Sequence, residues 1–310
     1  MFRNPGHASI VLLFLAALSS DAAAGQSLAI RRNSKYETRI EANSAIGIGY
    51  RLQASGELQG WADFSDQASG PLSYRIDNTG KTNRFFRLRT WAAENAPITL
   101  VLIGDSTVAD FVVNNSWFYG WGQGIYGYLK PNVRVVNLAL AGNSTKVFLT
   151  SLEMQNMIRL KPDFVLIHFS LADTQWPDEE SQVRTTTIPE YEANLKTIVQ
   201  AIRDFKGTPI LMTPANPRVF DDEKMVVPSM QDQCRVVKYV AAARQTYLID
   251  LNQLSRNLFN ELGETESAYI SWSDKDRGHF SLKGAEVIAG LVINAFPNIL
   301  RPHVVEIRSR

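Results

Sequence analysis

The chain is poor in the residues that build covalent or metal-linked frameworks. Cys234 is the one cysteine among 310 residues, which excludes an intrachain disulfide and a cysteine-based zinc cage. Only four histidines are present, so few side chains can act as a base near neutral pH. Neither sign of charge dominates, since 32 basic and 31 acidic residues give a net charge of +1. This balance gives no indication of nucleic-acid binding.

Long hydrophobic runs are absent beyond the N-terminus. There, Arg3 precedes an apolar stretch from Ile10 to Leu18, and the small residues Ala22-Ala23-Ala24 follow. This order predicts a secretory signal peptide over residues 1–24, because the stretch is too short for a membrane span. A retained N-terminal anchor is the alternative. We expect a bacterial periplasmic or secreted protein that has no membrane contact after cleavage.

The composition changes along the rest of the chain. Residues 26–90 hold short alternating runs punctuated by Gly, Asn, Ser and Asp, which predict a small antiparallel β-sandwich-like module. The segment WAAENAP, residues 91–97, is a predicted linker. Residues 98–300 form a larger second domain, and residues 301–310 form a polar tail.

Compact apolar runs recur in the second domain and predict strands that are buried on both faces. They cover residues 98–103, 133–138, 164–169, 209–213 and 246–249.

Helical segments separate these runs. The clearest covers 188–205, with Pro189 in its first turn and Gly207 after its end, and the final helix covers 282–295. Such alternation predicts a three-layer α/β/α fold around a doubly wound parallel sheet of about five strands. One apolar face of the helix at 188–205 carries Tyr191, Leu195, Ile198, Val199, Ile202 and Phe205.

In such sheets ligands bind at the carboxyl ends of the strands. The first run leads directly into Gly104-Asp105-Ser106-Thr107, which places Ser106 well for a nucleophile that needs a base. An N-cap serine is the alternative. Asp105, beside Ser106, is a candidate substrate-binding residue.

The base must be one of few histidines. His7 leaves with the signal peptide, His168 lies within a predicted strand and is a core candidate, and His303 lies in the polar tail and is expected at the surface. His279 follows Asp276 by three residues on a turn, where the carboxylate can orient the imidazole.

An acyl-transfer site also needs donors for an oxyanion. Gly142 follows the second predicted strand, and a glycine there lets a backbone N–H approach a substrate closely. Trp176 and Trp272 lie nearest the predicted cleft and are candidates for stacking on sugar rings, with packing as the alternative. No cofactor motif or metal-ligand cluster is visible.

Several blocks between residues 98 and 295 resemble the SGNH (GDSL-like) hydrolases, in the rhamnogalacturonan acetylesterase-like branch. They include GDSTVAD (104–110), VNLALAGNST (136–145) and DRGHFSLKGAEVIAGLV (276–292). The resemblance implies an SGNH hydrolase-like, flavodoxin-like fold. It further implies that Ser106 is the nucleophile, His279 the base and Asp276 its orienting acid, and that the backbone N–H groups of Ser106 and Gly142 bind the oxyanion.

One block departs from the family pattern. After the third strand the family has G-x-N-D, whose Asn is a third oxyanion donor, whereas this chain reads Ser170-Leu171-Ala172-Asp173. Ala172 has no side-chain donor. Asn143, beside Gly142, or Ser170 could substitute for it.

The resemblance implies a secreted O-acetyl esterase that acts on acetylated plant or algal polysaccharide or oligosaccharide. An SGNH lipase, lysophospholipase or thioesterase is the second hypothesis. A weakly active or non-catalytic carbohydrate-binding homologue is the third, because of Ala172.

Overall fold

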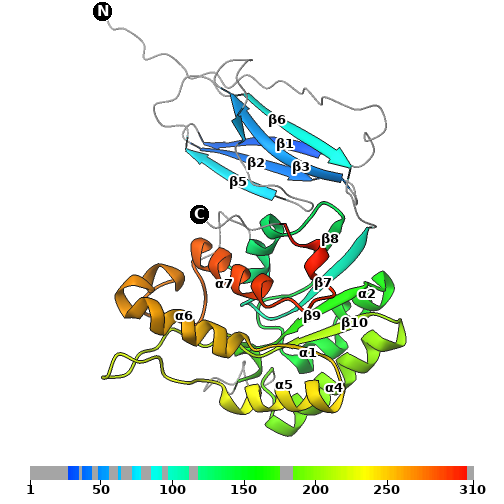
Figure 1. Cartoon of the computed structure of the whole chain (residues 1–310), viewed down its shortest axis with the longest axis vertical. Helices are drawn as coiled ribbons and strands as arrows, with labels where there is room; N and C mark the ends of the chain where they lie inside the picture. Colours follow the sequence, from blue (N-terminus) through cyan, green and yellow to red (C-terminus); the bar gives the residue numbers. More distant parts are fainter. Residues whose placement is uncertain are drawn as a thin grey trace, which may run out of the picture. The chain divides into compact units, whose positions relative to one another are not determined.

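The computed structural model describes the strands between residues 27 and 92 by their backbone, and it describes residues 97–111, 118–174 and 184–305 with their side chains (Figure 1). The predicted signal peptide and Trp176 lie outside the described residues.

The N-terminal segment forms two three-stranded antiparallel sheets, as the alternating pattern predicts. β6 continues through Ala92, so the predicted linker at 91–97 begins two residues too early. One sheet has the order β1-β2-β5, with β1 (Ser27–Ser34), β2 (Glu37–Asn43) and β5 (Leu72–Asp77). The other has the order β4-β3-β6, with β4 (Ala62–Asp63), β3 (Ile48–Ser55) and β6 (Phe85–Ala92).

A five-stranded sheet of order β11-β10-β9-β7-β8 forms the centre of the second unit. Each strand lies where an apolar run predicts it, and the doubly wound parallel fold is confirmed. The strands are β7 (Ile98–Gly104), β8 (Val133–Asn137), β9 (Phe164–His168), β10 (Thr208–Met212) and β11 (Tyr247–Ile249).

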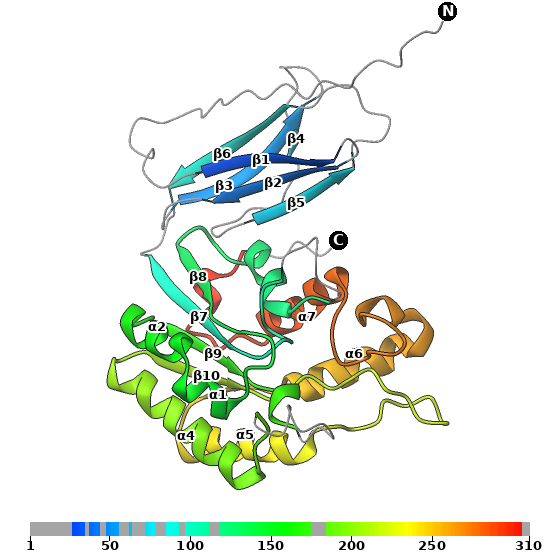
Figure 2. The same ribbon diagram turned by 180° about the vertical axis from the view of Figure 1, so that it is seen from behind.

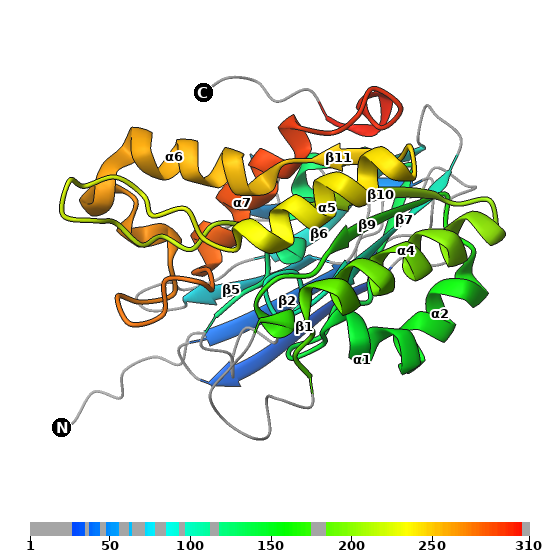
Figure 3. The same cartoon turned by 90° about the horizontal axis from the view of Figure 1, so that it is seen from below.

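Helices cover both faces of this sheet. α4 packs beside α5 on one face (Figure 3), and α7 lies on the opposite side of the sheet in both Figure 1 and Figure 2. The helices are α1 (Thr145–Thr150), α2 (Leu152–Leu160), α4 (Ile188–Asp204), α5 (Gln231–Ala243), α6 (Leu251–Glu266) and α7 (Leu282–Asn294). Short 3₁₀ helices are η1 (Trp121–Tyr128), η2 (Leu171–Asp173), η3 (Ala268–Ile270) and η4 (Arg301–His303).

The core forms where the sheet meets α4 and α5. Val101 and Ile103 of β7 pack with Leu195 and Ile198 of α4 in one buried cluster. Leu102 lies between them in sequence and therefore points to the opposite face of the sheet. It is also fully buried. Burial on both faces explains why these strands appear in the sequence as continuous apolar runs.

Local signals set the ends of α4. The Thr187 side chain accepts from the Glu190 N–H, while the Glu190 side chain accepts from the Thr187 N–H, which is a capping box. At the other end, the N–H of Gly207 donates to the Ile202 carbonyl at 3.0 Å, beyond the positive φ of 67° at Lys206. The predicted helix at 188–205 is therefore confirmed.

The order of the strands reverses direction at β7. From β7 the chain passes to β8 on one side, whereas β9, β10 and β11 follow one another on the other side. Ligands of doubly wound sheets bind at such a switch point. Gly104, which ends β7, is pressed against β9, since a Cβ there would lie 2.1 Å from the His168 carbonyl oxygen. Ser106 follows two residues later.

The first part of the predicted C-terminal tail is structured. Val304 forms an antiparallel bridge with Leu129, and Nδ1 of His303 lies 2.7 Å from Nδ2 of Asn132. His303 is therefore partly buried and not the surface residue that the sequence suggests. Residues 306–310 lie outside the described part of the chain.

The capping box of α4 generates the first prediction. Thr187→Ala removes the acceptor of the Glu190 N–H and should lower the free energy of unfolding by about 1 kcal/mol. Urea unfolding measures this change. Thr197→Ala is the matched control, because exposed Thr197 bonds only to a carbonyl of its own helix and alanine favours helix interiors. Equal losses in both variants would contradict the prediction.

Candidate active site

The structure brings together the three side chains expected to form a catalytic triad. Ser106 Oγ lies 2.8 Å from His279 Nε2, and His279 Nδ1 lies 2.8 Å from Asp276 Oδ2. The other carboxylate oxygen of Asp276 accepts from the backbone N–H of His279 at 3.0 Å and from that of Gly278 at 3.2 Å. The imidazole thus has a defined tautomer and orientation, in which Nε2 directs its lone pair towards the serine hydroxyl.

Asp276 is held as an ionised acceptor. Burial is the largest single influence and by itself raises the pKa of its carboxyl. The hydrogen bonds from His279 and Gly278 outweigh burial, so the net pKa lies below the ordinary value. The carboxylate can therefore stabilise a positive charge on the imidazole.

A hairpin just before α7 carries Asp276 and His279. Its two sides meet where the Trp272 N–H donates to the His279 carbonyl at 2.9 Å. The fully buried Arg218 anchors this hairpin. Its Nε donates to Ser271 Oγ at 2.9 Å, and its backbone N–H donates to the Arg277 carbonyl at 2.9 Å. Trp272, a predicted sugar-stacking residue, is partly buried beside His279.

Phe118 is a site residue that the sequence does not single out for this role. Its ring stacks on the His279 imidazole, with centroids 4.0 Å apart and an interplanar angle of 27°. Phe111 contacts the edge of Phe118, with centroids 4.8 Å apart. The stack restricts rotation of the base. The sequence offers one signal for it, since Phe118 lies in the aromatic run Trp117-Phe118-Tyr119 that follows the serine block.

Asp105 is a structural residue and not a surface for substrate, so its predicted substrate-binding role is revised. Its side chain is fully buried. Oδ1 accepts from the N–H and the hydroxyl of Thr107, at 2.9 and 2.7 Å. Oδ2 accepts from the N–H groups of Ser170 and Ala172, at 2.9 and 3.1 Å. One carboxylate therefore joins the serine turn to the turn after β9.

A second buried carboxylate joins that turn to α1. Asp173 accepts from the Thr145 N–H at 2.9 Å and from the Thr145 hydroxyl at 2.5 Å. Thr186 donates to the same carboxylate at 3.0 Å. Burial is the main cause that raises the pKa of Asp173 to about 7, against the hydrogen bonds from the two threonines.

Gly142 has a left-handed backbone conformation, and its N–H bonds to no acceptor among the described residues. Its φ is +73°, in the region that favours glycine. A Cβ at this position would lie 2.5 Å from Nη1 of Arg184, so a guanidinium lies over the glycine. Neither the Gly142 N–H nor the Ser106 N–H donates to an acceptor within the described part of the chain. Both groups are therefore available to a ligand.

The block that departs from the family pattern has no side-chain donor at position 172. The Ala172 N–H is already bonded to Asp105. The Ser170 hydroxyl donates to Met230 Sδ at 3.6 Å. Asn143 is 3% exposed, and neither its Nδ2 nor its Oδ1 has a partner among the described residues.

His168 is a core histidine, as its strand position suggests. It is fully buried, and burial is the main cause that lowers its pKa to about 4. Trp121 Nε1 lies 3.0 Å from its Nδ1, and the Ala215 N–H lies 3.2 Å from its Nε2. Both groups are donors, and a neutral imidazole has one acceptor nitrogen. In a neutral imidazole only one of these two contacts can therefore be a hydrogen bond. Both ring nitrogens lie against buried protein N–H groups, so neither faces a substrate.

The described residues offer neither a reactive thiol nor a metal-binding cluster. Burial is the largest cause that raises the pKa of Cys234 to about 12, which leaves this thiol protonated. The described residues include no cluster of His, Cys, Asp or Glu fit for a metal ion, and none of their helices is long and apolar enough to cross a membrane.

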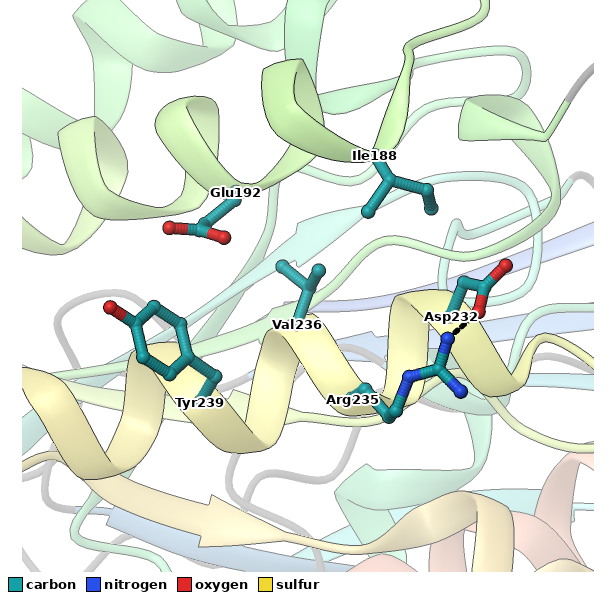
Figure 4. A pocket seen from close by; sticks show the side chains of 6 residues that line it. All are labelled: Ile188, Glu192, Asp232, Arg235, Val236 and Tyr239. Atoms are coloured by element: carbon teal, nitrogen blue, oxygen red, sulfur yellow. Dashed lines mark hydrogen bonds and ion pairs between the residues drawn. The ribbon is translucent and has the colours of Figure 1, made fainter.

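A hollow of about 340 Å³ lies between α4 and α5 (Figure 4). Its charged groups are engaged, since Glu192 pairs with Lys196 and Asp232 pairs with Arg235. It contains no triad residue. Its lining consists of Ile188, Glu192, Asp232, Arg235, Val236 and Tyr239.

A serine bonded to a carboxylate-oriented histidine, at the switch point of a doubly wound sheet, defines the class of α/β serine hydrolases. Residues 102–287 match the GDSL-like lipase/acylhydrolase family. The chain belongs to this family and is a serine esterase.

Curated relatives share much of the chain. The probable rhamnogalacturonan acetylesterase YesY of Bacillus subtilis is 30% identical over 211 residues, which cover 66% of this chain and 94% of YesY. The rhamnogalacturonan acetylesterase RhgT of the same organism is 26% identical over 227 residues, which cover 67% of this chain and 95% of RhgT.

Solved structures support the fold. Protein YxiM from Bacillus subtilis has a TM-score of 0.59 at 19% identity, covering 84% of this chain and 80% of that one. The acetylxylan esterase Axe2 from Geobacillus stearothermophilus has a TM-score of 0.51 at 22% identity, covering 65% of this chain and 94% of that one.

The four hydrogen bonds of Asp105 generate a prediction. In Asp105→Asn the side chain keeps one acceptor oxygen, so buried N–H groups on one side lose their partner. The free energy of unfolding should fall by about 1–3 kcal/mol or more, and esterase activity should fall because the serine turn loosens. Urea unfolding and initial rates measure both. Asp204→Asn is the control, since Asp204 is exposed and bonds only to Gln200. An Asp105→Asn protein with unchanged stability would refute this account.

The raised pKa of Asp173 predicts a pH-dependent stability. Folding raises this pKa from 3.8 to about 7, so between these values the folded state holds a proton that the unfolded state has released. The stability of the wild type, relative to Asp173→Asn, should therefore fall as pH rises from about 4 to 7 and then level off. Unfolding of both proteins across this range measures the difference. A difference that stays constant or grows with pH would contradict the assignment.

Proposed function

We propose that this protein is a carbohydrate O-acetyl esterase that uses Ser106, His279 and Asp276 in an acyl-enzyme mechanism. The observation that carries the proposal is the continuous hydrogen-bonded chain from Ser106 Oγ through the imidazole to the Asp276 carboxylate. No metal is required for this chemistry.

Acylation begins when Ser106 Oγ attacks the acetyl carbonyl carbon. The hydroxyl proton passes to His279 Nε2, which lies 2.8 Å away, and the carbonyl π electrons move onto oxygen. Asp276 stabilises the imidazolium that results. When the tetrahedral intermediate collapses, the bond from the carbonyl carbon to the sugar oxygen breaks. His279 then gives its proton to that oxygen, and the sugar alcohol leaves.

Deacylation repeats these steps with water. His279 Nε2 takes a proton from water, whose oxygen attacks the acetyl-serine carbonyl. Collapse breaks the bond to Ser106 Oγ, which recovers its proton from the imidazolium, and acetic acid is released. In both halves the backbone N–H groups of Ser106 and Gly142 donate to the oxyanion.

The substrate class is inferred from relatives and from chemistry near the base. YesY and RhgT carry names that describe rhamnogalacturonan acetylesterases. Trp272 lies on the hairpin of His279, where an indole can stack on a sugar ring. Trp176 remains a second candidate that lies outside the described residues. The signal-peptide pattern over residues 1–24 supports export, which would bring the enzyme to acetylated plant or algal polysaccharides.

The triad assignment predicts the behaviour of three variants. Ser106→Ala and His279→Ala should each reduce acetate release from an acetyl ester to near background. The double variant should be no slower, because serine and base act as one unit. His303→Ala is the histidine control and should retain activity. A His279→Ala enzyme with a rate near that of the wild type would show that another group is the base.

Substrate choice separates the esterase proposal from its alternatives. Wild-type rates on p-nitrophenyl acetate should exceed those on a long-chain acyl ester, and acetylated pectic or xylan oligosaccharides should release acetate. A preference for long acyl chains would favour a lipase, lysophospholipase or thioesterase. Ala172 favours a weakly active or binding homologue. Glycan binding with rates equal in the wild type and Ser106→Ala would support that reading.

A further inference from the structure

We propose that the Asn143 side chain supplies the oxyanion hydrogen bond that position 172 lacks, so that the donor has moved from the turn after β9 to the turn after β8. This inference rests on the proposed function only in requiring that Ser106 attacks a carbonyl or similar centre.

The first observation is an unsatisfied buried amide. Asn143 is 3% exposed, and both polar atoms of its side chain lack partners among the described residues. A buried polar group without a hydrogen bond costs about 1–3 kcal/mol, and such groups in folded proteins call for an explanation. The carbonyl oxygen of a bound substrate would explain the unpaired amide, because an amide N–H is a good donor to the negative charge that develops on that oxygen.

The second observation is the location of the turn. Before Asn143, the Leu140 N–H donates to the Gly104 carbonyl at 3.2 Å, which holds the turn against the strand end that leads to Ser106. The Asn143 N–H then closes the turn on the Leu140 carbonyl at 3.2 Å. After Asn143, the Thr145 N–H binds Asp173. The backbone of Asn143 is therefore held between the serine turn and the turn that carries Ala172.

The third observation is that the other candidate donors are engaged. The Ala172 N–H is bonded to Asp105, and the Ser170 hydroxyl faces the sulfur of Met230. Asn143 directly follows Gly142, whose N–H is available and whose Cα lies under the Arg184 guanidinium. The guanidinium adds positive potential to the same loop, which favours negative charge there.

Kinetics of four proteins test the proposal: the wild type, Asn143→Ala, Ala172→Asn and the double variant. Asn143→Ala should lower kcat on p-nitrophenyl acetate by about 10²-fold with little change in KM, because the oxyanion exists only on the way through the tetrahedral state. Ala172→Asn should change the wild-type kcat by less than about threefold and should restore at least about tenfold in the Asn143→Ala background.

A structural role for Asn143 is separated by isosteric and matched controls. Asn143→Asp keeps the shape but replaces the donor with an acceptor, so it should lose at least as much kcat as Asn143→Ala. Asn156→Ala removes a partly buried asparagine that lies outside the site and whose side chain bonds to Arg159, and it should leave kcat unchanged. If Asn143→Ala and Asn143→Asp both stay within about threefold of the wild type, or if Ala172→Asn restores nothing, the proposal is overturned.

Inactivation by p-nitrophenyl diethyl phosphate gives a readout that does not depend on the natural substrate. Ser106 Oγ forms the bond to phosphorus, the p-nitrophenolate leaves, and His279 takes the serine proton, while the phosphoryl oxygen occupies the oxyanion position. The inactivation rate should fall in Asn143→Ala and recover in the double variant. If this holds while no acetylated glycan is hydrolysed, the substrate proposal fails and the Asn143 assignment stands. An inactivation rate unaffected by Asn143→Ala would overturn the assignment even in an active acetyl esterase.

Discussion

The buried carboxylate of Asp105 is the constraint on which the site depends. It lies next to the nucleophile in sequence, yet its four hydrogen bonds reach both the serine turn and the turn after β9. Asp173 extends the connection to α1 through Thr145. A buried carboxylate is tolerated only when its lone pairs are satisfied, so each loop can move only by breaking bonds that water cannot replace. The loops that present Ser106, Gly142 and Ala172 are therefore tied together by buried hydrogen bonds.

The base is held by a different principle. His279 and Asp276 are adjacent on a hairpin, and the backbone of that hairpin supplies part of the acid's hydrogen bonds. The orientation of the imidazole is thus a local property, and only its approach to Ser106 depends on tertiary packing. Phe118 and Arg218 provide that packing from outside the hairpin, one by stacking on the ring and the other by anchoring Ser271.

Sequence patterns predict the parts of this arrangement that depend on local periodicity or on scarce chemistry. The five strands follow from continuous apolar runs and α4 follows from its caps, while His279 is selected because so few histidines remain. The role of Asp105 could not be predicted, since its partners at 170 and 172 become neighbours only when β9 pairs with β7. The stack of Phe118 on His279 has the same origin. The boundary at Ala92 was missed because β6 pairs with β3, which no local signal in 91–97 indicates.

The distance between nucleophile and base along the chain has a consequence for biosynthesis. Ser106 and His279 are 173 residues apart, and the hairpin of His279 is completed only shortly before the C-terminal end of the fold. A chain that is still being synthesised carries the serine before its base has been added. Until residues 276–279 have been made, Ser106 has no histidine to take its proton, and the serine is unreactive. Hydrolysis at this site therefore requires a chain that extends at least through the hairpin of His279.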